Sequence, residues 1–268
     1  MTVTTAPHRA LTMLVAATTV LLPASKALSA TVDLTTDAWG KIDTAIFTRD
    51  DSQPTGTGVF NPFLSLQHNP IEQGYNTSGG EVLDTTRVPQ WTHNLQLGQL
   101  QAVTVNGGSY YQFTLDANET GNGNINRLLS IDNIRIYTSA TGSQVTTDVN
   151  SLGICRYALN PLGNSDNWIM IDSTMGSTSG SGSSDLIAYI PTSAFDGVSA
   201  DDFVYFYNLN GAHFQSDDGT SADAGFEEWN ALTGPATVPD GGNTLVLFGS
   251  AITALGLVAG RRKMAANV

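Results

Sequence analysis

A chain of 268 residues is long enough for one large domain or two small ones. Its formal net charge is −13. Residues 31–237 hold all but one of its 24 acidic residues and only 6 of its 11 lysines and arginines. This excess of negative charge repels phosphate backbones, which argues against nucleic acid as a partner. Because Cys155 is the only cysteine, an intramolecular disulfide is excluded, and we expect a small buried apolar residue there, with an intermolecular bridge or a reactive thiol as alternatives.

The first 30 residues have the three parts of a secretory signal peptide. Arg9 supplies a basic start, residues 10–22 form an apolar run that is short for a membrane span, and small residues follow up to Ala30. We expect export through the Sec machinery and cleavage by signal peptidase after Ser29, or alternatively after Ala30. An uncleaved membrane anchor is the other interpretation.

Residues 31–232 predict one all-β domain, because short alternating or β-branched runs are separated by turn residues and helical periodicity is weak. A hairpin is expected over residues 101–115, with Asn106-Gly107-Gly108 as its turn. The strand expected over residues 128–139 contains a kink or bulge near Asp132-Asn133. Further strands are predicted over residues 167–174, 185–191 and 202–211. The pattern indicates an antiparallel β-sandwich of the jelly-roll type.

Two groups of aromatic residues in this domain have different expected roles. Tyr205 and Tyr207 share one face of their predicted strand and Phe206 lies on the other, which is typical of a strand buried between layers. Trp91 lies in the segment VPQWTHN between two predicted strands, and we expect it to be exposed and able to stack on a sugar face. It is the candidate for glycan contact.

Segment 213–229 concentrates acidic side chains, and Ca²⁺ prefers oxygen ligands from carboxylates and carbonyls. Glu227 and Glu228 point to opposite faces of an extended strand, so at most one of them faces a given site. A solvated acidic loop is the alternative interpretation, since the spacing is not that of an EF-hand. The predicted ligands of a structural calcium ion are Asp217, Asp218, Asp223 and Glu227, with Asp132 or Asp185 as further candidates.

Catalytic residues are not predicted. A glycosidase needs two carboxyl groups on either side of a sugar, and in so acidic a chain a chance pair is expected, but no motif selects one. No spacing links His68, His93 or His213 to Cys155 or to a metal site. We therefore expect a protein that is not an enzyme.

The chain ends with a second segment directed to the membrane. Residues 233–243 predict a linker, and residues 244–260 carry no charge and would span about 25 Å as a helix, the low end of a transmembrane length. Residues 261–268 form a basic tail, whose Arg261, Arg262 and Lys263 would stay on the cytoplasmic side. A buried core helix is the alternative.

The linker, helix and basic cluster together resemble the PEP-CTERM group of bacterial sorting tails, in the variant with the motif VPDSG. Gly241 stands where that variant has Ser. The resemblance implies that an exosortase recognises this tail as its substrate and cuts near the motif, which here reads Val238, Pro239, Asp240, Gly241 and Gly242.

A second resemblance lies in the domain itself. The segments NRLLSIDNIRIYTS, NWIMIDSTMGSTSGSGSSDLIAYIP and GFEEWNALTG are similar, in this order, to an extracellular domain that recurs in PEP-CTERM proteins. It covers residues 113–229 and implies a fold and a location, but no activity.

Together these features predict an exported bacterial surface or extracellular-matrix protein, anchored in the membrane by its C-terminal helix and then processed by an exosortase. Its non-catalytic β-sandwich would bind or scaffold polysaccharide or envelope components. Two alternatives stay open: a secreted hydrolase acting on polysaccharide, and a self-assembling structural coat protein. The only cofactor expected is structural calcium.

Overall fold

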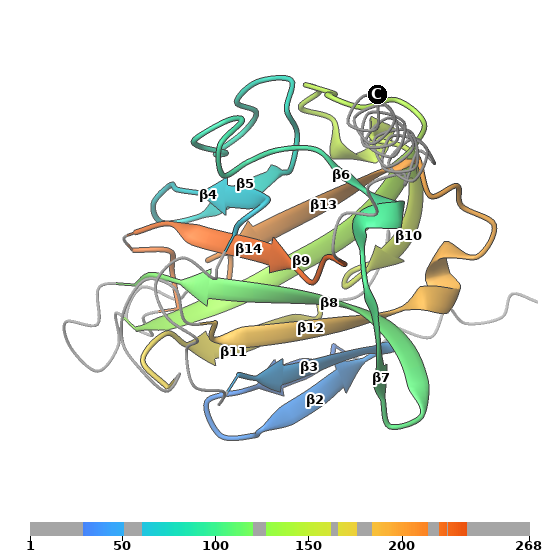
Figure 1. The fold of residues 1–268 in the computed structure, drawn as a ribbon. Coiled ribbons are helices and arrows are strands. Elements are labelled where there is room, and N and C mark those ends of the chain that lie inside the picture. The colour runs from blue at the N-terminus through green and yellow to red at the C-terminus, as the bar shows by residue number, and fades with distance from the viewer. Residues whose placement is uncertain are drawn as a thin grey trace, which may run out of the picture.

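The computed structural model describes residues 29–50, 61–119, 127–161, 166–175, 184–213, 220–223 and 225–234. In these ranges the regular structure is nearly all β, arranged as two sheets of seven strands each (Figure 1). This agrees with the predicted all-β sandwich. Most of the signal peptide, the sorting motif, the apolar segment 244–260 and the basic cluster lie outside the described residues. Within the described ranges, no helix has the length and apolar character needed to cross a bilayer.

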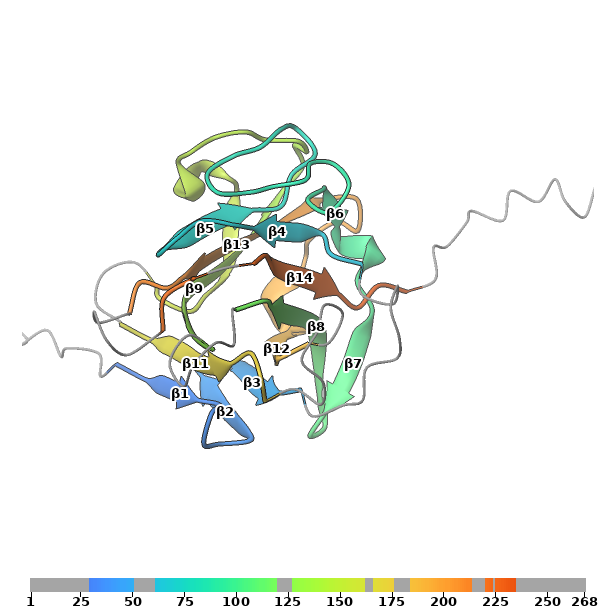
Figure 2. The ribbon, with the colours of Figure 1, turned by 90° about the vertical axis from the view of Figure 1, so that its left-hand side faces the viewer.

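The first sheet is built around the long antiparallel pair of β9 (Leu128–Ser139) and β13 (Phe203–Asn210). Its edge pair β1–β11 runs parallel, so the expectation of a purely antiparallel sandwich is wrong at this edge (Figure 2). The other strands of this sheet are β11 (Trp168–Asp172) and β10 (Ile154–Ala158) on β9, β1 (Thr31–Asp33) on β11, and β5 (Glu72–Tyr75) and β6 (Leu95–Gln96) on β13.

The second sheet is antiparallel throughout and centres on β8 (Gly108–Ala117). In sheet order its strands are β2 (Trp39–Ile42), β3 (Ala45–Arg49), β12 (Leu186–Pro191), β8, β14 (Glu227–Ala231) and β4 (Leu64–Leu66), with β7 (Ala102–Val105) also on β8. Three short 3-10 helices connect strands: η1 (Leu97–Gln99), η2 (Val149–Ser151) and η3 (Thr192–Phe195).

The predicted hairpin is confirmed. β7 and β8 pair through the two-residue turn Asn106-Gly107, whose φ angles of 50° and 81° are the left-handed values that a type I′ turn requires. The strands expected over residues 128–139, 167–174, 185–191 and 202–211 correspond to β9, β11, β12 and β13.

An aromatic core joins the two sheets. Phe206 of β13 packs on Phe113 of β8 and on Trp229 of β14, with ring centroids 5.0 and 4.7 Å apart, and all three side chains are fully buried. On the outer face of β13, Tyr205 and Tyr207 are buried in a second cluster. Both faces of this strand are therefore covered, as its pattern of apolar residues predicts.

Cys155 corrects one expectation. It lies on β10, which pairs only with β9 among the described strands, and its side chain is exposed rather than buried. The alternating pattern of this short strand is too weak to predict that the residue lies on the solvent side.

Candidate functional site

The predicted irregularity in the strand over residues 128–139 is a β-bulge at Asp132. In the pairing of β9 with β13, Asn133 lies opposite Leu209 and Ile131 lies opposite Asn210, so Asp132 has no partner across the ladder. A bulge adds one residue to a strand and changes the direction in which its side chain points. This bulge directs Asp132 toward the chain that follows β13.

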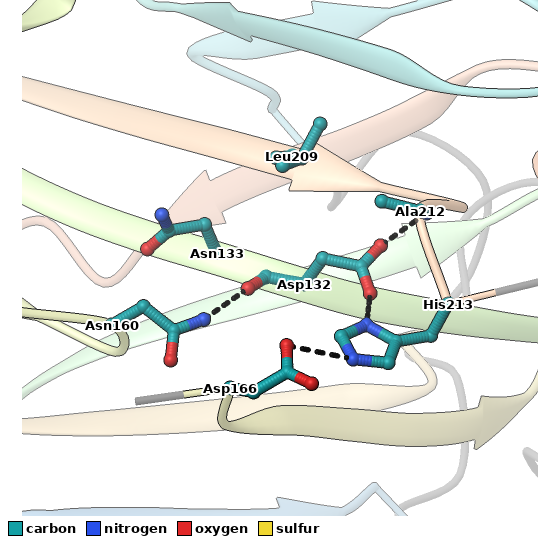
Figure 3. Close-up of a pocket in the computed structure, with 7 residues that line it drawn as sticks. All are labelled: Asp132, Asn133, Asn160, Asp166, Leu209, Ala212 and His213. Carbon is teal, nitrogen blue, oxygen red and sulfur yellow. Dashed lines mark hydrogen bonds and ion pairs between the residues drawn. The ribbon is translucent and has the colours of Figure 1, made fainter. Parts of the chain in front are cut away.

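Two carboxylates flank the imidazole of His213 at this place (Figure 3). Asp132 Oδ1 contacts the Nδ1 atom, and Asp166 Oδ1 lies 3.1 Å from the Nε2 atom. The Asp132 side chain is buried, whereas that of Asp166 is 78% exposed, so the site opens to solvent on the Asp166 side. Burial raises the pKa of Asp132, although hydrogen bonds from His213, the Ala212 backbone and Ser130 act in the opposite direction.

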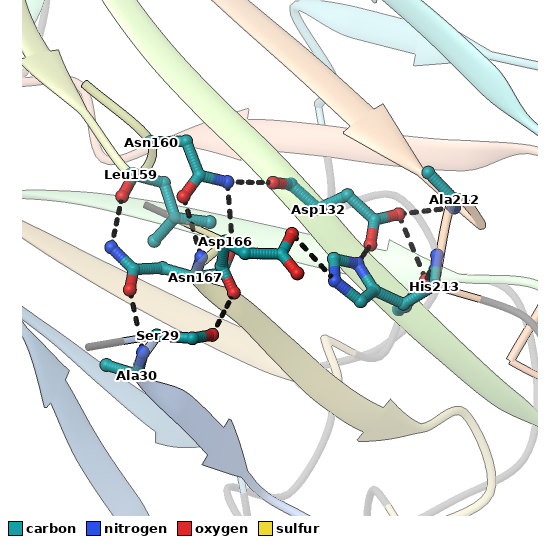
Figure 4. Close-up of polar contacts among 10 residues, drawn as sticks. Ser29, Ala30, Asp132, Leu159, Asn160, Asp166, Asn167, Ala212 and His213 are labelled. Atoms are coloured by element: carbon teal, nitrogen blue, oxygen red, sulfur yellow. Dashed lines mark hydrogen bonds and ion pairs between the residues drawn. The ribbon is translucent and has the colours of Figure 1, made fainter. Parts of the chain in front are cut away.

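An aromatic contact and an asparagine network hold this site in shape, and Figure 4 shows the polar contacts of the network. The ring of His213 stacks on Trp168, with centroids 4.8 Å apart and planes at 8°. Asn160 Nδ2 donates to the backbone oxygens of Asp132 and Asn167, both at 2.8 Å, and Asn167 N donates to Asn160 Oδ1 at 2.7 Å. The bulge is thus tied to the segment that carries Asp166 and Trp168.

The site borders an open polar pocket of about 470 Å³. Its lining residues are Asp132, Asn133, Asn160, Asp166, Leu209, Ala212 and His213 (Figure 3). Asn133 Oδ1 is buried and has no hydrogen-bond partner in the described part of the chain. Carboxylate oxygens accept hydrogen bonds and carboxamides both donate and accept them, so the pocket can bind a ligand that carries several hydroxyl groups.

Of the residues predicted to bind calcium, Asp223 and Glu227 both neighbour Glu119: Asp223 N donates to Glu119 Oε2 at 2.9 Å, and the Glu227 side chain is hydrogen-bonded to that of Glu119. Glu227 lies on β14 with a fully buried side chain, whereas Asp223 accepts a hydrogen bond from Ser221 at 2.8 Å. Asp217 and Asp218 lie outside the described residues. Asp132 belongs to the pocket, and Asp185 Oδ2 accepts from Ala117 N at 2.9 Å. In the described part of the chain, no three or more carboxylate, imidazole or thiol side chains form a group able to hold a metal ion.

Trp91, the predicted glycan contact, is half-buried. The guanidinium carbon of Arg87 lies 4.0 Å from the centre of its ring, and Phe226 packs against it edge-on at 6.4 Å. Arg87 therefore occupies one face of the indole. Trp91 does not line the pocket, and its ring neighbour Phe226 directly precedes Glu227.

Sequence reasoning did not assemble the pocket, because its residues come from four separate segments of the chain. The only local signal was the expected bulge near Asp132-Asn133. Nothing in the spacing of Asn160, Asp166 and His213 connects them, since their proximity depends on the pairing of β9 with β13 and β11.

A scan against protein-family models and searches of curated proteins and of solved structures found no match to this chain.

Proposed function

We propose that this chain is an exported bacterial surface or matrix protein whose β-sandwich binds polysaccharide without cleaving it. The observation that carries the proposal is the pocket at the β9 bulge, where carboxylates and carboxamides line an open cavity next to the stacked rings of His213 and Trp168. Sugar hydroxyl groups pair with such oxygen and amide groups, and aromatic rings pack on the apolar faces of sugars. The acidic charge of the domain favours neutral glycans over anionic ones.

The export and sorting half of the proposal rests on the sequence, and it is compatible with the position of Gly234, after which the predicted tail would follow. Gly234 N donates to Gln99 O at 3.1 Å, and Leu97 N donates to Asp202 O at 2.9 Å, so residue 234 lies near the beginning of β13. The pocket lies at the other end of this eight-residue strand, about 25 Å away. A membrane helix and sorting tail after residue 234 would therefore leave the pocket facing away from the membrane. In this proposal the sandwich has jelly-roll topology.

Binding can be tested with the full chain purified in detergent and with insoluble neutral polysaccharides. We expect the wild type to be retained, and the variants Asp166→Ala and His213→Ala to lose affinity at least about tenfold, as one or two hydrogen bonds to a ligand predict. Asp201→Ala is the matched control, because Asp201 is an exposed acid near the beginning of β13. Equal retention of all four proteins would contradict the assignment of the pocket.

A hydrolase is the second candidate, and one observation favours it: the pocket contains two carboxylates, of which burial raises the pKa of one, Asp132. Glycosidases use such an unequal pair as acid and base. The same polysaccharide assay distinguishes the two functions. A binder leaves the amount of soluble reducing sugar unchanged, whereas a hydrolase increases it and Asp132→Asn abolishes the increase.

A further inference from the structure

Three polar side chains meet between the two sheets, away from the solvent. Glu72 of β5 and Asn210 of β13 lie opposite each other in the first sheet, and Glu227 of β14 reaches them from the second sheet. The exposed fractions of the three side chains are 0%, 0% and 2%. Asn210 carries a neutral carboxamide, whereas the other two side chains carry carboxyl groups.

Each of these three side chains has an oxygen atom without a hydrogen-bond donor. Asn210 Nδ2 donates to Glu72 Oε1 at 2.6 Å, but Glu72 Oε2, Glu227 Oε1 and Asn210 Oδ1 are buried and have no hydrogen-bond partner among the described residues. A buried acceptor that loses water and gains no donor is costly, and a buried carboxylate more so. Three such atoms lie in contacting side chains, and the described protein atoms supply no partner that they could share.

The charges around the two carboxyl groups do not compensate them. Asp84 acts on Glu72 and Glu119 acts on Glu227, and both neighbours are acidic. Burial raises the pKa of both glutamates, and the charge of Glu72 raises that of Glu227 further. The Glu227 side chain lies within hydrogen-bonding reach of both Glu72 and Glu119, and protons shared among these carboxyl groups leave Asn210 Oδ1 without a donor.

We propose that Glu72, Glu227 and Asn210 bind a calcium ion between the two sheets. A divalent cation neutralises both carboxylates and accepts the carboxamide oxygen at the same time, and Ca²⁺ takes such mixed oxygen ligands in flexible geometry. Two carboxylates and one carboxamide come from β5, β13 and β14, so the ion joins the sheets. Glu227 belongs to the set expected from the sequence, whereas Glu72 and Asn210 come from strands that the acidic segment does not contain.

The site has a direct connection to the pocket. Asn210 is the last residue of β13, and the next three residues carry Ala212 and His213 into the pocket. An ion that fixes the Asn210 side chain therefore fixes the point from which this segment leaves the sheet. The assignment of the ion does not depend on the pocket binding a glycan.

The test uses the full chain in detergent, freed of metal with a chelator at pH 7.5 and titrated with CaCl₂ by calorimetry and by thermal unfolding. At a calcium concentration about 100-fold above the Kd, we expect Tm to rise by about 5–10 °C. Glu72→Gln and Glu227→Gln should fold, because they remove a buried charge without changing side-chain size, and both should lose the heat of binding and the Tm shift. Asn210→Ala should weaken calcium binding at least about tenfold.

Two control variants locate the ion. Glu81→Gln changes an exposed glutamate, and Asp116→Asn changes a buried acid that is paired with Glu228 rather than with Glu227, so both should bind calcium as the wild type does. Loss of binding in Asp116→Asn with retention in Glu72→Gln would overturn the assignment. A wild type whose Tm does not respond to calcium at any concentration up to 10 mM would also overturn it, and would indicate a shared proton instead.

Discussion

At the scale of single residues, Gly211 determines how the chain leaves β13 for the pocket. Its φ angle is +78°, and a Cβ atom there would lie 2.3 Å from Pro70 O and 2.8 Å from Ala222 N, both of them backbone atoms. Gly211→Ala therefore adds backbone strain and a clash that no side-chain rotation removes, and we expect a loss of about 2–4 kcal/mol in the free energy of unfolding. Urea denaturation measures it.

The matched control is Gly107→Ala in the hairpin turn. Gly107 has a similar φ angle of +81°, but a Cβ atom there meets nothing within 4 Å. This variant should cost only the strain, about 1 kcal/mol. If the two variants were equally stable, the close approach of Pro70 and Ala222 to Gly211 would add nothing to the loss in the free energy of unfolding, and the prediction would be wrong.

Asp185 predicts a pH dependence of stability. Burial, with added repulsion from Asp116, Asp172 and Asp50, raises its pKa to about 8, from an unfolded value near 4. Between these two values the folded protein holds a proton that the unfolded chain releases, so stability is greatest at the acid end of the window and falls as pH rises through it. Asp185→Asn removes this loss. We expect it to be more stable than the wild type by roughly 1–3 kcal/mol at pH 8, and to differ little at pH 4.5, in urea denaturation at both pH values.

At the scale of elements, a buried hydrogen bond links β13 to β14. Trp229 Nε1 donates to Asn208 Oδ1 at 2.8 Å, and Asn208 Nδ2 donates to Asn133 O at 3.1 Å. Asn208→Ala leaves both partners buried and unsatisfied, so we expect a loss of about 2–4 kcal/mol in the free energy of unfolding. In a double-mutant cycle with Trp229→Phe, which removes the indole donor, the second substitution should cost less than it does alone. Strict additivity would show that the two side chains do not interact.

The elements that could be predicted from the sequence are those whose pattern is local. β9, β12 and β13 are long runs of β-branched and aromatic residues, and the turn of the β7–β8 hairpin contains Asn106-Gly107. Strands such as β4 and β6 have three and two residues, too few to display a period of two, and their existence depends on β14 and β13 beside them. The parallel pairing of β1 with β11 joins segments almost 140 residues apart and has no local signal.

In the candidate sites, too, only the features that depend on a single strand could be predicted from the sequence. Asp132 could be expected at a bulge, and Glu227 could be expected to face away from Glu228, because both inferences need only the strand that carries the residue. The partners of Asp132 and of Glu227 could not be predicted, since Glu72, Asn210, Asp166 and His213 become neighbours only when the sheets pair and close on each other. The sequence shows the residue types of both sites, but it does not show the register in which distant strands pair.

At the scale of the whole molecule, the two ends of the domain differ in chemistry. The first residues of β5 and β14 and the last residues of β8 and β13 come together with the residue before β12. The polar residues gathered there are Glu72, Glu227, Asp116, Asn210 and Asp185. Residue 234 leaves from the opposite end, near η1. This arrangement separates the proposed ligand pocket and cation site from the part that would continue into the predicted sorting tail.

The first described residues, Ser29 and Ala30, lie next to the pocket, and their contacts distinguish the two predicted sites of signal-peptide cleavage. Ala30 N donates to Asn167 Oδ1 at 2.8 Å, and Trp168 N donates to Ala30 O at 3.2 Å, while Ser29 Oγ contacts Asp166 O (Figure 4). Cleavage after Ser29 keeps both Ala30 contacts, whereas cleavage after Ala30 removes them. An uncleaved anchor would attach the membrane at the pocket end, opposite to the end that the C-terminal helix would use.

We therefore expect the mature protein in its native host to begin at Ala30 and to end near Val238, with or without an added anchor. Intact-mass measurement of the protein from membranes and from medium tests both ends at once. Replacing Pro239 and Asp240 with Ala should leave the N-terminus unchanged and retain residues 244–268, because only the exosortase substrate motif is altered. A wild-type mass that includes residues 261–268 in both fractions would contradict sorting. It would make the chain a single-pass membrane protein that still presents the same pocket outward.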